Sequence, residues 1–324
     1  MRPHPGAPAL VGTVVGGRYR VIQLLGSGGT GDVYLAEGVG GHAGGYPQTP
    51  GRVAPAPSRV AIKVLRAEHH ADRQLIRRFR REAEAAASVR HLNLLEVLEP
   101  PFEADGILCF VMELLVGLDL ADTLAYSRTL GPARAVGIAA GAADGLAAAH
   151  AAGVVHRDVK PENIFLVHAA DGREAVKLLD FGFAWMPGDR AAWRGPTYPW
   201  SRWGAPAAPA AGPSALGTPE YMAPEQAQGA APRPSADIYS LGIVLYEMLA
   251  GRAPFAGDYP AIAREHGERP VPPIRSFNPA AALSPELEAV LSGALAKDPA
   301  DRFSSMGAIR LALLATPEAS GRAV

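Results

Sequence analysis

The chain has 324 residues, enough for one large domain or for two lobes around a cleft. Its 31 lysine and arginine residues nearly balance its 32 aspartate and glutamate residues. This balance argues against a protein that coats nucleic acid or binds a membrane surface through its bulk charge. The single cysteine, Cys109, excludes an internal disulfide framework and indicates a small buried side chain in a reducing compartment.

No stretch has the pattern of a secretion signal or of a membrane span. Residues 1–16 are expected to form a flexible lead-in, because the start of the chain is rich in proline and glycine and lacks the apolar core of a signal peptide. The most apolar run, residues 138–155, contains Asp144, His150 and three glycines, so it is a poor membrane span. We therefore expect a cytoplasmic location.

A glycine-rich loop separates two predicted strands, residues 19–25 and 33–36. The loop reads Gly26-Ser27-Gly28-Gly29-Thr30-Gly31. Glycines let the backbone approach phosphate oxygens, because no side chain stands in the way. A dinucleotide-binding fold needs a helix directly after the glycines, whereas Val33 begins a predicted strand, which favours a hairpin folded over ATP. A dinucleotide site and an ordinary glycine turn remain as alternatives.

Lys63 lies within an otherwise apolar strand, residues 60–64. Residues 38–59, just before it, are too poor in apolar side chains to bury themselves and are expected to be a disordered insertion. A buried lysine is costly unless it is paired, and an anionic phosphate together with a carboxylate would supply the pairing. The alternative is a lysine at the edge of the strand, exposed to solvent.

The carboxylate is expected on the next helix, residues 72–87. Its apolar residues recur at helical spacing, and Glu82 lies on the same side as Phe79 and Ala86. Glu82 is therefore predicted to point inward, whereas Glu84 lies off the apolar stripe and is interpreted as a surface residue.

The stretch His156-Arg157-Asp158-Val159-Lys160-Pro161-Glu162-Asn163 combines the groups needed for phosphoryl transfer. Asp158 can orient a hydroxyl, Lys160 can balance phosphate charge and Asn163 can bind Mg²⁺ through its oxygen. Further on, Asp180 follows an apolar strand and precedes a glycine, where it can also chelate Mg²⁺. No paired carboxylate or cysteine accompanies His150 or His156, so both are interpreted as histidines satisfied by the backbone.

These motifs, in this order, resemble those of protein kinases. The matching segments are the glycine-rich loop, V-A-I-K at 60–63, the eight-residue stretch at 156–163, D-F-G at 180–182 and the G-T-x-x-Y-x-A-P-E end of an activation segment at 217–225. Lysine at position 160 is typical of serine/threonine kinases. The resemblance covers residues 17–314. The residues chosen within several of these motifs are similar to those of bacterial eukaryotic-like serine/threonine kinases.

The resemblance implies a role for each candidate residue. The implied catalytic residues are Asp158, Lys160, Lys63, Glu82 and Thr218, and the implied metal ligands are Asn163 and Asp180. The implied ATP contacts are Gly26, Ser27, Gly28, Gly29, Thr30, Gly31, Val33, Ala61, Lys63, Met112, Glu113, Leu115, Asp122 and Phe165. It further implies an ion pair of Lys63 with Glu82, a buried ion pair of Glu225 with Arg302, an architectural His156, and bonds from Thr218 to Asp158 and Lys160.

The activation segment, residues 180–225, departs most from the family pattern. The stretch of residues 183–216 within it is long and rich in proline. It holds all four tryptophans, namely Trp185, Trp193, Trp200 and Trp203. They could dock a substrate or block the cleft, or be an insertion without a role. In the family, an arginine at the position of Arg157 receives a phosphorylated residue of this segment. The candidates for autophosphorylation in trans are Thr197, Ser201 and Ser214, of which Ser214 is preferred.

The sequence thus predicts an α+β protein with a two-lobed protein-kinase-like fold. A small β-rich N-lobe is expected over residues 17–113, a larger, mainly α-helical C-lobe over residues 114–315, and a tail over residues 316–324. The predicted reaction is ATP- and Mg²⁺-dependent transfer of a phosphoryl group to serine or threonine of protein substrates, with Mn²⁺ as a possible substitute. A pseudokinase scaffold that acts through protein partners is the alternative, and a dinucleotide-dependent oxidoreductase is a distant third.

Overall fold

A computed structural model describes residues 10–39, 59–168, 174–186 and 219–320 of the chain. Nearly all of the expected insertion at 38–59 therefore lies outside the described residues. The chain divides into two units, Met1–Arg90 with Leu95–Val116 and His91–Leu94 with Gly117–Val324. They correspond to a β-sheet unit and a helical unit, which confirms the predicted fold class.

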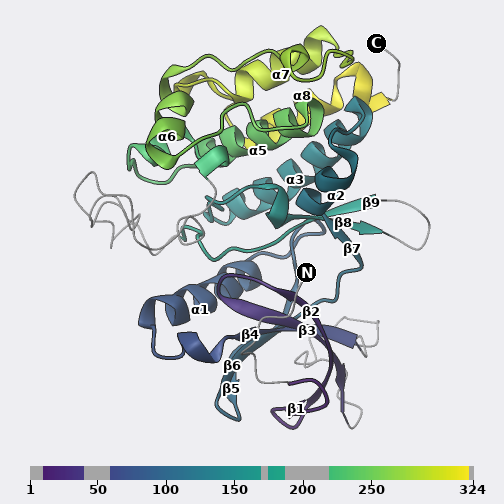
Figure 1. Cartoon of the computed structure of the whole chain (residues 1–324), viewed down its shortest axis with the longest axis vertical. Coiled ribbons are helices and arrows are strands. Elements are labelled where there is room, and N and C mark those ends of the chain that lie inside the picture. Colours follow the sequence, from purple (N-terminus) through teal and green to yellow (C-terminus); the bar gives the residue numbers. More distant parts are fainter. Residues whose placement is uncertain (1–9, 40–58, 169–173, 187–218, 321–324) are drawn as a thin grey trace. The chain divides into compact units, whose positions relative to one another are not determined.

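The first unit is built on a six-stranded antiparallel sheet with the order β1-β2-β3-β4-β6-β5 (Figure 1). The strands are β1 (Val14–Val15), β2 (Tyr19–Ser27), β3 (Gly31–Gly38), β4 (Arg59–Leu65), β5 (Val97–Ala104) and β6 (Ile107–Met112). The strands predicted at 19–25, 33–36 and 60–64 are all present, each longer by two to four residues. The sheet holds the glycine-rich loop and Lys63 on adjacent strands.

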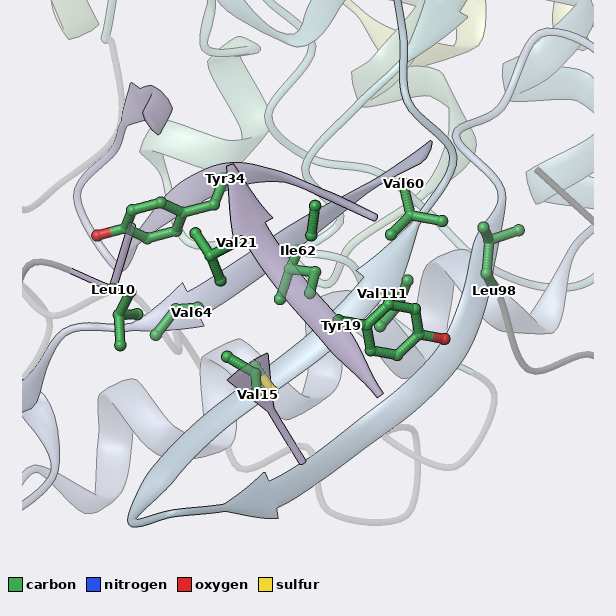
Figure 2. Packing of buried hydrophobic residues seen from close by; sticks show 12 residues of the cluster. Leu10, Val15, Tyr19, Val21, Tyr34, Val60, Ile62, Val64, Leu98 and Val111 are labelled. Carbon is green, nitrogen blue, oxygen red and sulfur yellow. The ribbon is translucent and has the colours of Figure 1, made fainter. Parts of the chain in front are cut away.

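Side chains that alternate along the strands form an apolar core on one face of this sheet. Ile62 and Val64 of β4 pack there with Val21 of β2 and Val111 of β6 (Figure 2). Cys109 is fully buried in the same cluster, as predicted, and this burial raises the pKa of its thiol to about 12. The thiol is thus held in its protonated form.

The start of the chain differs from the expected lead-in. Leu10 and Val15 are buried in the core of the sheet, and β1 pairs with β2 through Val14 opposite Arg20. The edge of β2 offers both hydrogen-bonding groups and apolar surface. Leu10 and Val15 stabilise this segment because they cover that surface. Residues 10–15 therefore pack as part of the first unit, with Val14–Val15 as an edge strand of the sheet.

Helix α1 (Arg73–Ser88) is the one α-helix described in the first unit. It begins at Asp72, whose carboxylate accepts hydrogen bonds from the backbone N–H groups of Gln74 and Leu75. Its buried face carries Phe79, Ala83 and Ala86 together with Glu82. The predicted inward orientation of Glu82 is confirmed.

The second unit is mainly helical and carries one small antiparallel sheet (Figure 1). The helices are α2 (Leu120–Ser127), α3 (Pro132–Ala151), α4 (Pro224–Ala227), α5 (Pro234–Ala250), α6 (Tyr259–Glu268), α7 (Pro285–Ala294) and α8 (Met306–Leu314). The strands are β7 (Gly117–Asp119), β8 (Ile164–His168) and β9 (Glu174–Leu178). The short 3₁₀ turns include η2 (Pro161–Asn163), η6 (Pro219–Tyr221) and η9 (Pro317–Ser320). Among the described residues, no helix is both long and apolar enough to cross a membrane.

Helix α5 lies at the centre of this unit, where its residues are buried on nearly every side, as its apolar pattern predicts. It contacts α3 and α7. The end of the described chain also packs against this unit, although residues 316–324 were expected to form a tail. Glu318 in η9 is buried there. Its carboxylate is satisfied because it accepts hydrogen bonds from the backbone N–H and the hydroxyl of Ser284, at 2.7 and 2.8 Å.

Candidate active site

The glycine-rich loop is the turn of the hairpin formed by β2 and β3. Gly26 lies opposite Val33 and Ser27 opposite Asp32, and the N–H of Gly28 donates to the carbonyl of Gly31 at 2.9 Å. A strand therefore follows the glycines, as predicted. Since a dinucleotide-binding fold needs a helix at this point, that alternative is wrong.

The glycines of this loop serve different purposes. A Cβ atom added at Gly31 would lie 2.3 Å from the carbonyl oxygen of Val64 on the adjacent strand, so Gly31 is required by the close approach of β3 to β4. A Cβ atom at Gly26 or Gly29 would meet nothing within 4 Å. Positions 26 and 29 thus leave open space in which a ligand could approach the backbone.

Lys63 and Glu82 form the predicted ion pair, with 2.5 Å between Nζ and Oε1. Their side chains are 12% and 7% exposed, so the alternative of a solvent-exposed lysine at the strand edge is wrong. Lys63 comes from β4, opposite Val33 and Phe110, while Glu82 comes from the buried face of α1. Both charges are compensated, because a buried lysine and a buried glutamate are tolerated when they are paired.

The predicted adenine contacts lie where β6 ends. Met112 is buried opposite Ala61 of β4. The N–H of Glu113 donates to the carbonyl of Glu96 at 3.0 Å, while the Glu113 carboxylate accepts from the N–H of Glu96 at 2.8 Å. Glu113 is thus fixed within the first unit, and Leu115 follows it half-buried. The contacts of these residues with a nucleotide stay predictions.

Two predicted nucleotide contacts belong to the second unit. Asp122 is exposed on α2, and its N–H donates to the carboxylate of Asp119, which begins the helix. Phe165 of β8 is half-buried and lies opposite Asp119 of β7. Asp122 thus presents its carboxylate to solvent, as a ribose contact would require, but no described contact tests that role.

Asp158 lies at the centre of the predicted catalytic stretch. Its carboxylate oxygen Oδ2 accepts from Nζ of Lys160 at 2.9 Å and from Nδ2 of Asn163 at 3.1 Å. The same amide group of Asn163 also donates to the backbone carbonyl of Asp158 at 2.7 Å. Three residues that are close in the sequence are thus locked into one hydrogen-bonded group, which fixes the direction of the Asp158 carboxylate.

Asp237 anchors the beginning of this stretch. Its fully buried carboxylate on α5 accepts from the backbone N–H groups of His156 at 2.9 Å and Arg157 at 2.7 Å, and it is 2.7 Å from Nε2 of His150. Burial by itself raises the pKa of this carboxyl, but the bonds from His150 and Arg157 outweigh it and hold the pKa below its ordinary value. Arg157 keeps a backbone φ of 70°, which the two anchored N–H groups stabilise.

This role of Asp237 was not predicted from the sequence. The available signal was a charged residue in the first turn of a helix that is otherwise apolar on all sides. Such a residue is buried, and a buried charge needs partners. The interpretation of His150 was also wrong in one respect, since its partner is the Asp237 carboxylate and not the backbone. The interpretation of His156 fits the structure, because its Nε2 is 2.9 Å from the carbonyl oxygen of Leu179.

Asp180 and Asn163 are joined through the backbone. The N–H of Leu179 donates to the carbonyl of Asn163 at 2.9 Å, which brings the residue before Asp180 beside η2. Asp180 has a φ of 54°, and its carboxylate accepts from the N–H of Gly182 at 2.9 Å. The amide nitrogen of Asn163 bonds to Asp158, which leaves its amide oxygen on the other side of the group. One carboxylate and one amide oxygen fit Mg²⁺, which binds few protein ligands and completes its shell with phosphate and water.

The described ends of the activation segment are held in the second unit. Trp185 is buried and exchanges two backbone hydrogen bonds with Val155, at 2.8 and 2.9 Å. At the other end, Arg302 forms the predicted buried ion pair with Glu225. Several predictions fall outside the described residues, namely those on Thr218, Thr197, Ser201, Ser214, Trp193, Trp200 and Trp203.

The protein kinase domain family matches residues 51–313 of the chain. This chain belongs to the protein kinase family. Among curated proteins, the kinase resembles serine/threonine-protein kinase pkn3 of Myxococcus xanthus, with 36% identity over 96% of this chain and 52% of the relative. It also resembles serine/threonine-protein kinase PkaB of Streptomyces coelicolor, with 38% identity over 89% of this chain and 61% of the relative.

A solved structure shows the same fold. The kinase domain of Mycobacterium tuberculosis PknI, a C20A_R136N double mutant, is similar with a TM-score of 0.61 and 30% identity, over 93% of this kinase and 96% of that chain. The chain spans about half to three fifths of the length of these two curated relatives.

Proposed function

We propose that this kinase transfers the γ-phosphoryl group of ATP to serine or threonine hydroxyls of protein substrates in bacterial signalling. The observation that carries the proposal is the bonding of Asp158 to Lys160 and Asn163, which are the groups that phosphoryl transfer requires. The serine/threonine kinases among its relatives support the same reaction. The proposal includes a kinase domain over the predicted residues 17–315, extended by residues 10–16 and 316–320 that pack with its two units, and a cytoplasmic location.

The proposed roles follow from the chemistry of the side chains. The Asp158 carboxylate orients the acceptor hydroxyl and takes its proton, while the Lys160 ammonium balances charge on the transferred phosphoryl group. Lys63 binds the phosphates of ATP, oriented by Glu82. Mg²⁺, or Mn²⁺ in its place, would neutralise phosphate charge when bound to Asn163 and Asp180.

Incubation with labelled ATP, Mg²⁺ and a generic protein substrate tests the proposal, with Asp158→Asn as the control. We expect the variant to lose at least about 100-fold in rate, because a positioned acid or base contributes this much to a proton transfer. A thermal shift with ATP and Mg²⁺ should be equal in both proteins, since the substitution keeps the shape of the side chain. Equal and negligible transfer by both proteins would refute the proposal.

A pseudokinase scaffold is the second candidate. The unusual composition of residues 183–216 favours it, because this proline-rich segment holds three tryptophans besides the buried Trp185, and tryptophans fit a binding surface as well as an activation segment. If wild type and Asp158→Asn transfer equally little phosphate while partner binding survives in both, the scaffold replaces the enzyme. Autophosphorylation in trans belongs to the enzyme hypothesis, and mass spectrometry after incubation with ATP would test Ser214, Thr197 and Ser201.

A further inference from the structure

Asp32, the residue directly after the glycine-rich loop, is a buried carboxylate on the apolar face of the sheet. Its neighbours on this face are Tyr34, two residues further along β3, and Val64, opposite it on β4. Both belong to the buried apolar cluster (Figure 2). A carboxylate in such surroundings is costly unless it has a partner.

The partner of Asp32 is Arg66, which directly follows β4. Nε of Arg66 donates to Oδ1 of Asp32 at 3.1 Å, and the two side chains are 19% and 7% exposed. Nη1 of Arg66 is also 3.9 Å from Oε1 of Glu68, but Glu68 is exposed, so this second contact is weak. The Asp32–Arg66 pair therefore joins the end of the glycine-rich loop to the end of β4.

The position of the loop depends on how β3 is held. The described β1 pairs only with the first two residues of β2, so the loop end of β2 pairs with β3 alone among the strands that the structure describes. Two register shifts interrupt that pairing, the second just before Gly26. In contrast, β3 pairs with β4 without interruption from Gly31 to Glu37. The attachment of β3 to β4 thus decides where the loop lies.

The pair lies on the face of the sheet opposite to that of Lys63. Successive side chains of a strand point to opposite faces, so Lys63 and Val64 point in opposite directions. Lys63 points toward α1, where it meets Glu82, while Val64 shares the face of Asp32. A ligand bound by Lys63 would therefore lie on the other side of the sheet from the pair. Asp32 can influence such a ligand only through the backbone of the loop.

Stability alone does not account for this pair. A buried ion pair gains little over well-packed apolar side chains of similar volume, and apolar side chains fill the rest of this face. What the pair adds is a fixed geometry, because a charged hydrogen bond holds its two partners in one arrangement. A charge on an otherwise apolar face thus indicates a requirement on position.

We propose that Asp32, held by Arg66, is a positioning residue for the glycine-rich loop. The pair keeps the loop at the separation from Lys63 that the phosphates of ATP require. This inference rests on the proposed binding of ATP. It concerns affinity for the nucleotide, so it holds for an active kinase and for a scaffold that binds ATP.

Calorimetric titration with a non-hydrolysable ATP analogue and Mg²⁺, together with steady-state kinetics, tests the proposal. The test variants are Asp32→Asn and Arg66→Gln, each of which removes one charge of the pair. Glu37→Gln is the matched control, because Glu37 pairs with Arg59 at 2.8 Å between the same two strands, at the end far from the loop. Arg66→Lys keeps the positive charge and is the rescue variant.

We expect both test variants to bind the analogue at least about tenfold more weakly and to raise KM for ATP by a similar factor, because a displaced loop misplaces its phosphate contacts. Their kcat, and all constants of Glu37→Gln and Arg66→Lys, should stay within about threefold of the wild type. A pair that only stabilises the fold would reduce the number of active molecules and leave Kd and KM unchanged. That result, or an equal loss of affinity in Glu37→Gln, would overturn the proposal. If the wild type did not bind the analogue, the proposed ATP site itself would be refuted, and this inference with it.

Discussion

The guanidinium group of Arg302 forms two parallel hydrogen bonds with the carboxylate of Glu225, from Nη1 to Oε1 at 2.7 Å and from Nη2 to Oε2 at 2.9 Å. Arg302 also donates to the carbonyl groups of Ser235, Ala296 and Lys297, and its side chain is completely buried. The pair therefore ties the end of the activation segment to the segment between α7 and α8.

Glu225→Gln should lower the free energy of unfolding by about 3–5 kcal/mol, because it leaves the buried Arg302 charge without its counterion. Urea unfolding measures the change. Glu265→Gln, which removes the half-buried partner of the exposed Arg269, is the control and should cost less than about 0.5 kcal/mol. Arg302→Lys should not preserve stability, since lysine cannot form two parallel bonds. Similar losses for Glu225→Gln and Glu265→Gln would contradict this account.

Lys63→Met and Glu82→Gln should each lower kcat/KM for phosphoryl transfer by about 100-fold or more, because each removes one member of the ion pair that orients the phosphate ligand. The double variant should lose no more than the worse single variant, since the two residues act as one unit. Steady-state kinetics with a protein substrate measures both effects. Additive losses would show that the pair does not act as a unit.

His266 should make stability depend on pH between about 4 and 6.5. Burial, with the nearby Lys297 ammonium, lowers its pKa from the ordinary 6.5 to about 4. The folded protein thus keeps His266 neutral while the unfolded chain protonates it. This contribution is complete above pH 6.5 and is lost as pH falls toward 4, by roughly 3 kcal/mol at most. Urea unfolding at several pH values would detect it, and His266→Gln should show a flatter profile. An unchanged profile would exclude His266 as the cause.

Gly31→Ala should destabilise the first unit by about 1–3 kcal/mol, because its Cβ atom would collide with the Val64 carbonyl of the adjacent strand. Gly29→Ala should change stability by less than about 0.5 kcal/mol, since a Cβ atom there meets nothing within 4 Å. Thermal unfolding of the two variants gives the comparison. If Gly29→Ala proves as damaging as Gly31→Ala, the loop glycines do not differ in the way the structure indicates.

The structure of segments whose residues are close in the sequence was predicted well. The strands around the glycine-rich loop, the helix that carries Glu82 and the group of Asp158, Lys160 and Asn163 follow from periodicity and short motifs, because their geometry is set by local backbone structure. The ion pairs of Lys63 with Glu82 and of Glu225 with Arg302 were predicted by family resemblance, since spacing alone does not reveal a partner 77 residues away.

The sequence by itself determined the order of the elements and the inward orientation of Glu82. Only the tertiary structure decided which other charges are buried and where they find partners. Asp237 bonds the catalytic stretch and His150 because folding brings α5 beside both, and Leu10 is buried because the edge of β2 is exposed without it. A buried polar group must be satisfied, but which distant group satisfies it depends on how the chain packs.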